Sequence, residues 1–484
     1  MEGPDSSNPP GRKSQPAAAF DDSAWEAIAL PHTWNAKDGN APGFYQEDGW
    51  YRRCFQVPAA WAGKRIYVQF DGANRSAEVF LNGHRLGQHR GGFARFRLDA
   101  TSAADGNGSN VLAVRVNNDP HDNLAPVSAD FTFFGGLYRA VSLVATDPVH
   151  IDMLDHAAPG VYVRQKQVTA DAAELDLQVK LANAAATTAD VTVRTTITEA
   201  DGTPVQTVET QASLAALARG ETRSRLLLAH PHLWNGQADP YLYRVQTEVV
   251  VAGGVRDAVT LPLGLRFFSV DPARGCSLNG RHLDLHGVNR HQDRPGKGWA
   301  ISEADEREDF AMIEEIGATA ARQSHYQQSQ LWNNLGDECG MVMWAELAYV
   351  NDARDNREFS ENAKEQLRER RPQRRRHAGP QRQRTRDRRP DNEEGRVLLV
   401  PGELERPAGA AHHVGAVRRP DATGDHRQDL LQRRGRRVAR QRGFPRIEDK
   451  RQPCFPVARG DAADGPQRHC GGRHPRWTRA HGRL

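Results

Sequence analysis

The first part of the chain alternates hydrophobic and polar residues with a period of two. Apolar side chains occupy every second position in segments 66–70, 77–81 and 112–116, and turn residues lie between these segments. Such alternation is typical of strands with one buried and one solvated face, and short strands at regular spacing favour a two-sheet sandwich. We therefore predict a β-sandwich over residues 20–145.

A second stretch of alternation follows a break near residue 145. Segments 175–181 and 191–197 again place apolar residues at every second position, and the pattern continues to about residue 264. A β segment of this length with this spacing fits an immunoglobulin-like sandwich. We therefore predict a second, immunoglobulin-like β-sandwich over residues 146–264.

The pattern changes in the third region, where segments with a helical period separate short apolar runs. The predicted elements are a strand at 283–286, a helix over 302–317, a strand at 318–322, a helix over 329–340 and a strand at 341–344. The order β-α-β-α-β indicates a parallel sheet with helical crossovers. We therefore predict the beginning of an α/β domain over residues 265–369, which stops after three strands.

Charge is distributed unevenly over the 484 residues, although the net charge is only +4. From residue 370 onward the chain has 29 arginines, one lysine and 13 acidic residues, which gives +17 against −13 for the rest. This segment has no apolar period and cannot bury enough surface to offset its ordering entropy. We therefore predict a disordered Arg-rich tail over residues 370–484, and a disordered N-terminus over residues 1–19.

Several classes of protein are excluded by composition. No apolar run approaches the roughly 20 residues that a membrane helix needs, so no membrane partner is expected. The start lacks a secretory signal, which predicts a cytoplasmic protein as written, or a periplasmic or secreted one if the true start lies upstream. The five cysteines are scattered and form no C-x-x-C pair, which excludes a disulfide framework and a zinc site of that type.

Several motifs in order resemble glycoside hydrolase family 2, the β-galactosidase and β-glucuronidase family. The resemblance covers roughly residues 20–369. The motifs that carry it are Leu30–Asn35, Gly49–Arg53, Phe70–Gly72, Leu81–Gly83, Asp130–Arg139, Gly264–Arg266, Gly287–Asp293 and Arg322–Tyr326.

The resemblance implies a fold and a function for each region. It implies a jelly-roll sugar-binding β-sandwich, an immunoglobulin-like β-sandwich and an incomplete (β/α)8 TIM barrel. The implied reaction is retaining hydrolysis of terminal β-galactosides in carbohydrate catabolism, with β-glucuronidase or β-mannosidase specificity left open. The implied partner is a carbohydrate, and the parent enzyme is compatible with an oligomer.

Polar residues follow the predicted barrel strands at the end where such barrels hold their sites. By resemblance, Asn289, His291 and His325 would bind sugar hydroxyls, and Asp130 would reach over from the first sandwich to contact the terminal sugar. In the alternative interpretation, the two histidines are satisfied structural residues, and Asp130 is a solvated loop carboxylate.

Glu346 directly follows the third strand, where the family places a carboxylate. It is either a substrate-binding pocket residue or a structural partner, and Arg322 braces the barrel through an ion pair more readily than it touches substrate. Metal-dependent members of the family bind magnesium farther along this loop. The sequence Leu347–Asp352 does not match that pattern, so no cofactor or metal is predicted.

Both catalytic carboxylates of a retaining glycosidase are missing from the family-like region. The family's acid/base glutamate stands in Gly-Asn-Glu after the fourth strand, and this sequence contains no Gly-Asn-Glu. A frameshift near codon 369 in a GC-rich gene would explain the composition that follows. We therefore expect no turnover, and poor solubility because a three-stranded sheet exposes its edge.

Two other functions remain as hypotheses. The first is a non-catalytic carbohydrate-binding protein that uses the first sandwich. The second is nucleic-acid binding by the tail, but the tail lacks aromatic residues interleaved with its arginines. We therefore predict no specific nucleic-acid partner.

Overall fold

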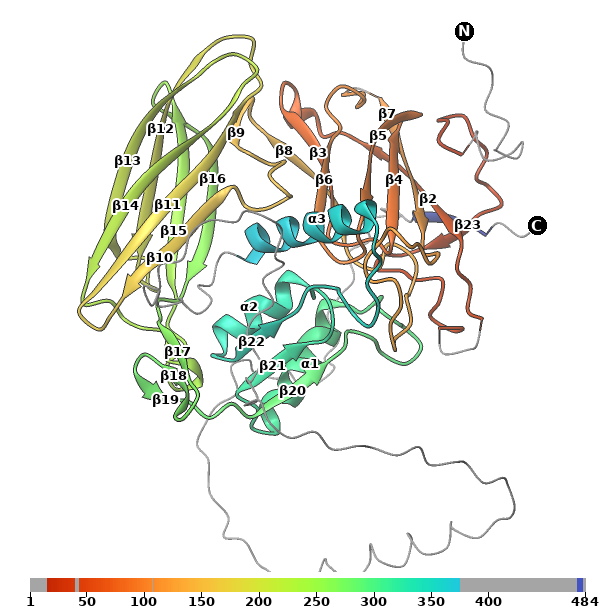
Figure 1. Cartoon of the computed structure of the whole chain (residues 1–484). Coiled ribbons are helices and arrows are strands. Elements are labelled where there is room, and N and C mark those ends of the chain that lie inside the picture. The colour runs from red at the N-terminus through yellow and green to blue at the C-terminus, as the bar shows by residue number, and fades with distance from the viewer. Residues whose placement is uncertain (1–14, 40–42, 107, 375–476, 482–484) are drawn as a thin grey trace, which may run out of the picture. The chain divides into compact units, whose positions relative to one another are not determined.

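A computed structural model describes residues 15–39, 43–106, 108–374 and 477–481 (Figure 1). Most of the predicted disordered segments 1–19 and 370–484 lies outside these residues. Where the structure describes them, residues 15–19 form turns and bends, residues 370–374 complete a helix and residues 477–481 form a strand. No helix in the described ranges is both long enough and apolar enough to cross a bilayer.

The first domain is a sandwich of two antiparallel sheets, as predicted (Figure 1). Its strands are β1 (Glu26–Ile28), β2 (Asp48–Gln56), β3 (Arg65–Phe70), β4 (Ser76–Leu81), β5 (His84–Arg90), β6 (Phe96–Asp99), β7 (Ser109–Asn117) and β8 (Val141–Thr146), joined by β23 (Trp477–His481). One sheet has the order β1-β23-β2-β7-β4-β5 and the other the order β6-β3-β8. The alternating apolar residues of β3, β4 and β7 form the shared core.

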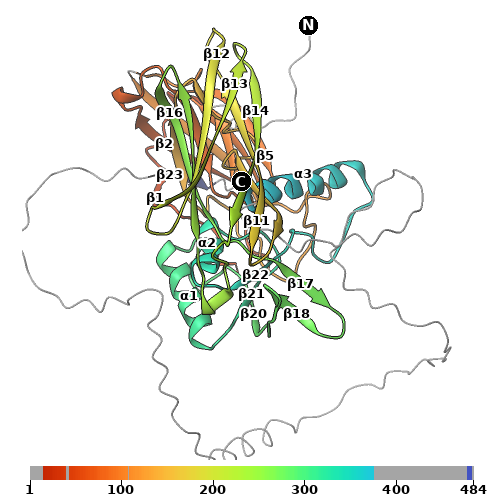
Figure 2. The same ribbon diagram turned by 90° about the vertical axis from the view of Figure 1, so that its left-hand side faces the viewer.

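The second domain is also a two-sheet sandwich, seen from another side in Figure 2. Its strands are β9 (Val149–Ile151), β10 (Val161–Val168), β11 (Ala172–Asn183), β12 (Ala189–Thr198), β13 (Pro204–Leu214), β14 (Arg219–Ala229), β15 (Tyr243–Val251) and β16 (Gly254–Leu263). The apolar faces predicted for segments 175–181 and 191–197 are buried together in its core. One predicted inward position, Thr195, is polar, and it is satisfied by a 2.9 Å hydrogen bond with Thr247.

The third domain begins with a small antiparallel sheet and continues as a parallel one. Its elements are β17 (Phe268–Asp271), β18 (Gly275–Leu278), β19 (Arg281–His282), β20 (Gly287–Arg290), α1 (Glu303–Glu315), β21 (Ala320–Gln323), α2 (Gln330–Glu338), β22 (Val342–Ala345) and α3 (Arg357–Arg374). Strands β20, β21 and β22 pair in parallel, and α1 and α2 cover the same side of their sheet (Figure 2). This is the predicted start of a TIM barrel.

Helices α1 and α2 begin at the residues whose side chains cap them. The hydroxyl of Ser302 accepts from the backbone N–H of Asp305, and the Asp305 carboxylate returns the bond in a capping box. Ser329 caps α2 by accepting from the N–H of Trp332. Both starts agree with the sequence prediction, because capping is a local signal.

The predicted strand at 283–286 is wrong, because the first barrel strand lies farther along, at 287–290. The side chain of Thr319 accepts from the N–H of His286 and donates to the carbonyl of Asp284, so these groups stay outside the parallel ladder. The apolar alternation at 283–286 does not mark a core face, since Leu285 is 39% exposed.

The strand correction also moves Asn289, which lies within β20 rather than after it. In register, Asn289, Arg322 and Trp344 are neighbours across the three strands. The residues before Arg322 and Trp344, which are Ala321 and Met343, pack against the core residues of α1 and α2. Asn289, Arg322 and Trp344 therefore share the opposite, helix-free face. Trp344 is 61% exposed there. In a closed barrel this face would line the interior.

Helix α3 packs against the first domain through side-chain amides. Asn362 accepts from the N–H of Ala125 and donates to the carbonyl of Arg90. Gln366 donates to the carbonyl of Ala125 at 2.8 Å. These amide contacts tie the start of the barrel to the sandwich that precedes it in sequence.

The second domain and the barrel segment are in close contact where Gly236 meets Gly340. Gly340, which follows α2, has φ +77°, and a Cβ there would lie 2.2 Å from the carbonyl carbon of Gly236. Gly317, which follows α1, has φ +78° but nothing within 4 Å of the corresponding point. The two positions therefore share the left-handed backbone and differ only in their neighbours.

This contrast predicts unequal effects of the same substitution. Gly317→Ala should lower the free energy of unfolding by about 1–2 kcal/mol, the cost of a left-handed backbone for a residue with a Cβ. Gly340→Ala should cost a further ~1–3 kcal/mol, because the Cβ overlaps the backbone of Gly236. Denaturant unfolding curves measure both, and equal losses would show that the Gly236 contact is not tight.

Candidate functional site

The helix-free face of the three barrel strands carries a connected polar network. Both Nε and Nη2 of Arg322 lie 2.6 Å from Oε1 of Glu346, and the other carboxylate oxygen lies 2.8 Å from Nδ1 of His325. Nη1 of Arg322 also reaches Oδ1 of Asn289 at 3.4 Å. The network joins one residue from β20, one from β21 and the residues that directly follow β21 and β22.

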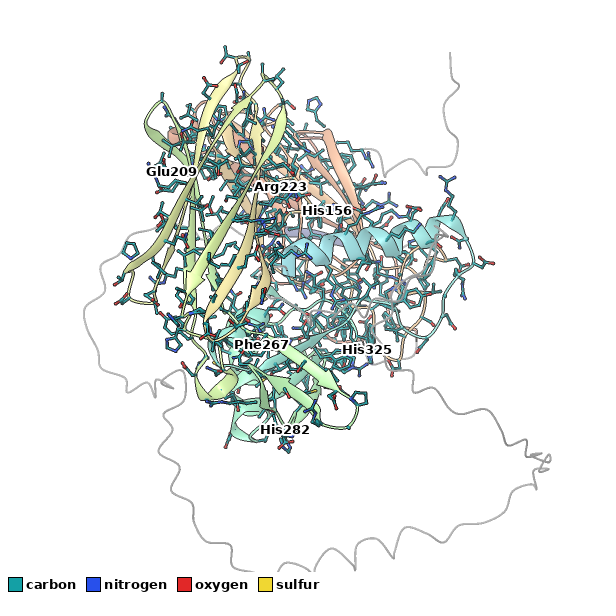
Figure 3. The ribbon with its side chains drawn as sticks, turned by 60° about the vertical axis from the view of Figure 1, so that its left-hand side comes forward. His156, Glu209, Arg223, Phe267, His282 and His325 are labelled. Atoms are coloured by element: carbon teal, nitrogen blue, oxygen red, sulfur yellow. The ribbon has the colours of Figure 1, made fainter. Side chains whose placement is uncertain are left out.

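Glu346 fixes the orientation of His325, which is labelled in Figure 3. Nδ1 of His325 is 2.8 Å from the carboxylate and 3.2 Å from Nη2 of Arg322. Only one of these contacts can be a full hydrogen bond, and the shorter, charge-assisted one is the stronger. Nδ1 therefore carries the proton and donates to Glu346, which leaves Nε2 as an acceptor when the ring is neutral.

His291 is held in the opposite tautomer to that of His325. Its Nδ1 lies 3.4 Å from the hydroxyl of Tyr326. Burial raises the pKa of Tyr326, so the phenol keeps its proton. The phenol can then donate to Nδ1 of His291, which places the ring proton on Nε2.

The environment keeps the His291 ring neutral at pH 7. Burial is the main cause that lowers its pKa below the ordinary 6.5, and the positive charge of Arg322 acts in the same direction. The carboxylates of Asp293 and Asp130 oppose this shift.

A loop of the first domain covers the two histidines with an aromatic ring. The ring of Phe131 lies 5.6 Å from that of His291 and 6.4 Å from that of His325, and the two imidazoles lie 5.4 Å apart. Asp130, the preceding residue, is exposed. The loop therefore brings the Phe131 ring against both imidazoles and leaves the adjoining Asp130 exposed.

Arg139 holds this loop region against the barrel segment. Its Nη2 donates to the side chain of Gln292 at 2.8 Å and to the carbonyl of Gln327 at 3.0 Å. Its Nη1 donates within the first domain, to the carbonyls of Phe93 and Asp71. One guanidinium thus joins the two domains beside the site.

An aromatic cluster fills the space beneath the contact. It consists of Phe93, Phe133, Phe134, Tyr138, Trp299 and Tyr326, all buried. Phe93 stacks on Tyr326 at 4.6 Å, and Trp299 lies 5.0 Å from the same ring. Sequence reasoning did not single out Phe131 or this cluster as part of the site. The density of aromatic residues in 131–138 was the available signal.

Four of the five predicted substrate-binding residues are joined by contacts. Asn289, His325 and Glu346 are linked through Arg322, and the ring of His291 contacts that of His325. Asp130 adjoins Phe131 in the covering loop. His291, His325 and Glu346 are partly buried, whereas Asn289 and Asp130 are exposed. Glu346 is engaged through both oxygens, which favours the structural partner of the two interpretations, and Arg322 forms the predicted ion pair. Within the described ranges, no cluster of three or more histidine, cysteine or acidic residues has the geometry of a metal site.

The burial of His291 predicts how it titrates. Its imidazole should protonate with a midpoint below 6.5, and Phe131→Ala should raise that midpoint, because water then reaches the ring. A lowered pKa favours the neutral form in the folded protein, so this contribution to stability is present above pH 6.5 and is lost on acidification. NMR titration of the histidine ring protons measures the midpoint.

The control for this titration is Phe267→Ala, the same change at a partly buried ring of another domain junction (labelled in Figure 3). It should leave the His291 midpoint unchanged. If Phe131→Ala also leaves it unchanged, the loop does not desolvate His291, and the described geometry of the site is contradicted.

Three family models match the chain in succession. The model of the glycosyl hydrolases family 2 sugar binding domain matches residues 15–147, the glycosyl hydrolases family 2 model matches residues 149–266, and the TIM barrel domain model matches residues 273–380. The last match runs past the predicted boundary at residue 369.

Relatives of known identity point to the same family. A β-glucuronidase of Bacteroides fragilis is 39% identical over 350 residues, which are 70% of this chain and 50% of that protein. A β-galactosidase of Bacteroides ovatus is 33% identical over 342 residues, 68% of this chain and 38% of that protein. The chain therefore spans half or less of the length of these curated relatives.

Solved structures show the same fold. The crystal structure of a Bacteroides uniformis β-glucuronidase superposes with a TM-score of 0.73 at 33% sequence identity. The superposition covers 75% of this chain and 44% of that one. Together with the three successive family matches, this agreement shows that the chain belongs to glycosyl hydrolase family 2.

Proposed function

We propose that the described face is the sugar-binding wall of a retaining glycosidase that acts on a terminal β-glycoside. The observation that carries the proposal is the pairing of two oppositely held imidazoles. Nδ1 of His325 is held by Glu346 and Nδ1 of His291 faces Tyr326, so each ring has its Nε2 available.

The two Nε2 atoms offer complementary hydrogen-bonding groups. His291 offers an N–H donor, and neutral His325 offers an acceptor. A sugar hydroxyl both donates and accepts, and a desolvated hydroxyl must find partners for both functions. Asp130 adds a carboxylate acceptor at the exposed side. This arrangement suits a ring of neighbouring hydroxyls better than a single charged group.

Two sugar classes remain as candidates. A terminal β-galactoside is the first, because the charge of Arg322 is already balanced by Glu346 on this wall. A terminal β-glucuronide is the second, because the relatives include β-glucuronidases as well as β-galactosidases. The sugars share the hydroxyl pattern in part and differ in the carboxylate, so direct comparison separates them.

Calorimetric titration tests the proposal and the specificity together. The chain should bind methyl β-galactoside or methyl β-glucuronide with a Kd of about 1 mM, because the three strands and the covering loop contact only one side of a sugar. Asp130→Asn should weaken binding about 5- to 10-fold through loss of one charged acceptor. His291→Gln should weaken it similarly.

The matched control is Asp171→Asn, the same change at an exposed loop carboxylate of the second domain. It should leave the affinity unchanged. Equal affinity of the wild-type chain, Asp130→Asn and His291→Gln for both glycosides would refute the proposed wall.

Catalysis is a separate matter, because this sequence contains no Gly-Asn-Glu. We expect the purified chain to hydrolyse neither an aryl β-galactoside nor an aryl β-glucuronide above the buffer rate, since retaining hydrolysis needs two carboxylates about 5–5.5 Å apart. Release of the aryl group measures this. Turnover that disappears on mutation of a single glutamate within residues 1–369 would contradict the expectation.

A frameshift remains our proposal for the change in composition after the family-like region. The arginine excess over lysine from residue 370 onward supports it. A non-catalytic carbohydrate-binding protein is the second candidate function, favoured by the same lack of Gly-Asn-Glu. Tight sugar binding without hydrolysis would favour it.

A further inference from the structure

Strand β23, from the end of the sequence, lies between the first two strands of the first domain (Figure 2). It pairs antiparallel with β1 over Glu26–Ile28 and antiparallel with β2 over Gly49–Arg52. Arg479 is central, because its partners are Glu26 on one side and Tyr51 on the other. The strand therefore fills a slot between β1 and β2, and both of these strands pair with it through their backbone groups.

The position of β1 in its sheet depends on the occupant of this slot. In the described sheet, β1 pairs only with β23, whereas β2 also pairs with β7 along its whole length from Asp48 to Gln56. An empty slot would leave the backbone groups of β1 and one edge of β2 without strand partners. Unpaired strand edges of this kind bind extended peptides.

The two walls of the slot are held by contacts that do not involve β23. Ile28 of β1 is buried in the core of the first sandwich. The residue that follows the next turn, His32, donates its N–H to the carbonyl of Leu137 at 2.9 Å. The chain after β1 is thus fixed to the sandwich independently of the slot.

The chain before β1 is fixed as well. The guanidinium of Arg52, a buried residue of β2, donates to the carbonyls of Gln15 and Ala17, and its Nε pairs with Asp22 at 2.9 Å. Residues on both sides of β1 are therefore anchored, and β1 stands two strand spacings from β2, about 9.6 Å. Contacts outside β23 therefore hold β1 and β2 apart, and β23 fills the space between them.

We propose that the slot between β1 and β2 is a strand-accepting site for an extended peptide of about five residues, and that its occupant is this chain's own segment Trp477–His481. Recognition runs through the main chain on both sides, so it tolerates varied side chains and excludes proline at the paired positions. This tolerance explains how a segment of the arginine-rich region fits between two strands of the first sandwich. The inference does not rest on the proposed function.

Hydrogen exchange of the full chain tests the site. In a chain that ends at Pro475, the amides of 26–28 and those on the open edge of 49–52 should exchange at least about 10-fold faster, because their strand partner is gone. The β7 amides at 112–116 should not change and serve as the internal control. Mass spectrometry of peptic fragments resolves the three segments.

Peptides added in trans separate main-chain recognition from a general effect of truncation. A synthetic peptide of residues 475–484 should restore slow exchange at 26–28. The Arg479→Ala peptide should restore it equally, whereas Arg479→Pro should fail, since only proline removes the amide at the central position. Within the full chain, the same two substitutions should give the same contrast.

Two exchange results and one result on oligomeric state would overturn the proposal. The first two are unchanged exchange at 26–28 in the shortened chain and equal rescue by the alanine and proline peptides. The third concerns the source of the strand. Light scattering should show a monomer, and a dimer that becomes monomeric in the chain ending at Pro475 would mean that a second copy supplies the strand.

Discussion

The guanidinium of Arg139 is the interaction on which the geometry of the candidate site depends. It donates to two carbonyls of the first domain and to Gln292 and Gln327 of the barrel segment, so a single side chain links the two domains directly beside the site. Hydrogen bonds from a charged group are worth about 1.5–3 kcal/mol each. The ring of Phe131 adds direct contacts with the barrel segment, because it lies 5.1 Å from the ring of Tyr326 and 6.1 Å from that of Trp299.

The site follows from this contact by a chain of local constraints. The aromatic cluster beneath Arg139 buries Tyr326, whose hydroxyl faces His291, and Glu346 holds His325 from the other side. Nδ1 of each imidazole therefore already has a hydrogen-bonding partner within the protein. The barrel strands supply rigid positions, and the first sandwich supplies the ring that excludes water. The candidate site is therefore built by both domains.

Sequence patterns predicted what depends on local order. The core faces of both sandwiches follow from period-two alternation, and the starts of α1 and α2 follow from Ser302 and Ser329, because capping acts within one turn. The alternation at 283–286 misled, since the Thr319 side chain holds that segment outside the ladder. Arg139, Phe131 and β23 act across long separations in sequence, and no local period reveals such contacts. The site residues themselves came from a family resemblance.

The central claim is that a sugar contacts both imidazoles through Nε2. Nitrogen-detected spectra of the histidine side chains, recorded while methyl β-galactoside or methyl β-glucuronide is added, test it most directly. The account predicts saturable shifts of Nε2 in His291 and His325, and no shift in His156 or His282, which are labelled in Figure 3. Saturable sugar binding that leaves both site histidines unshifted would contradict it.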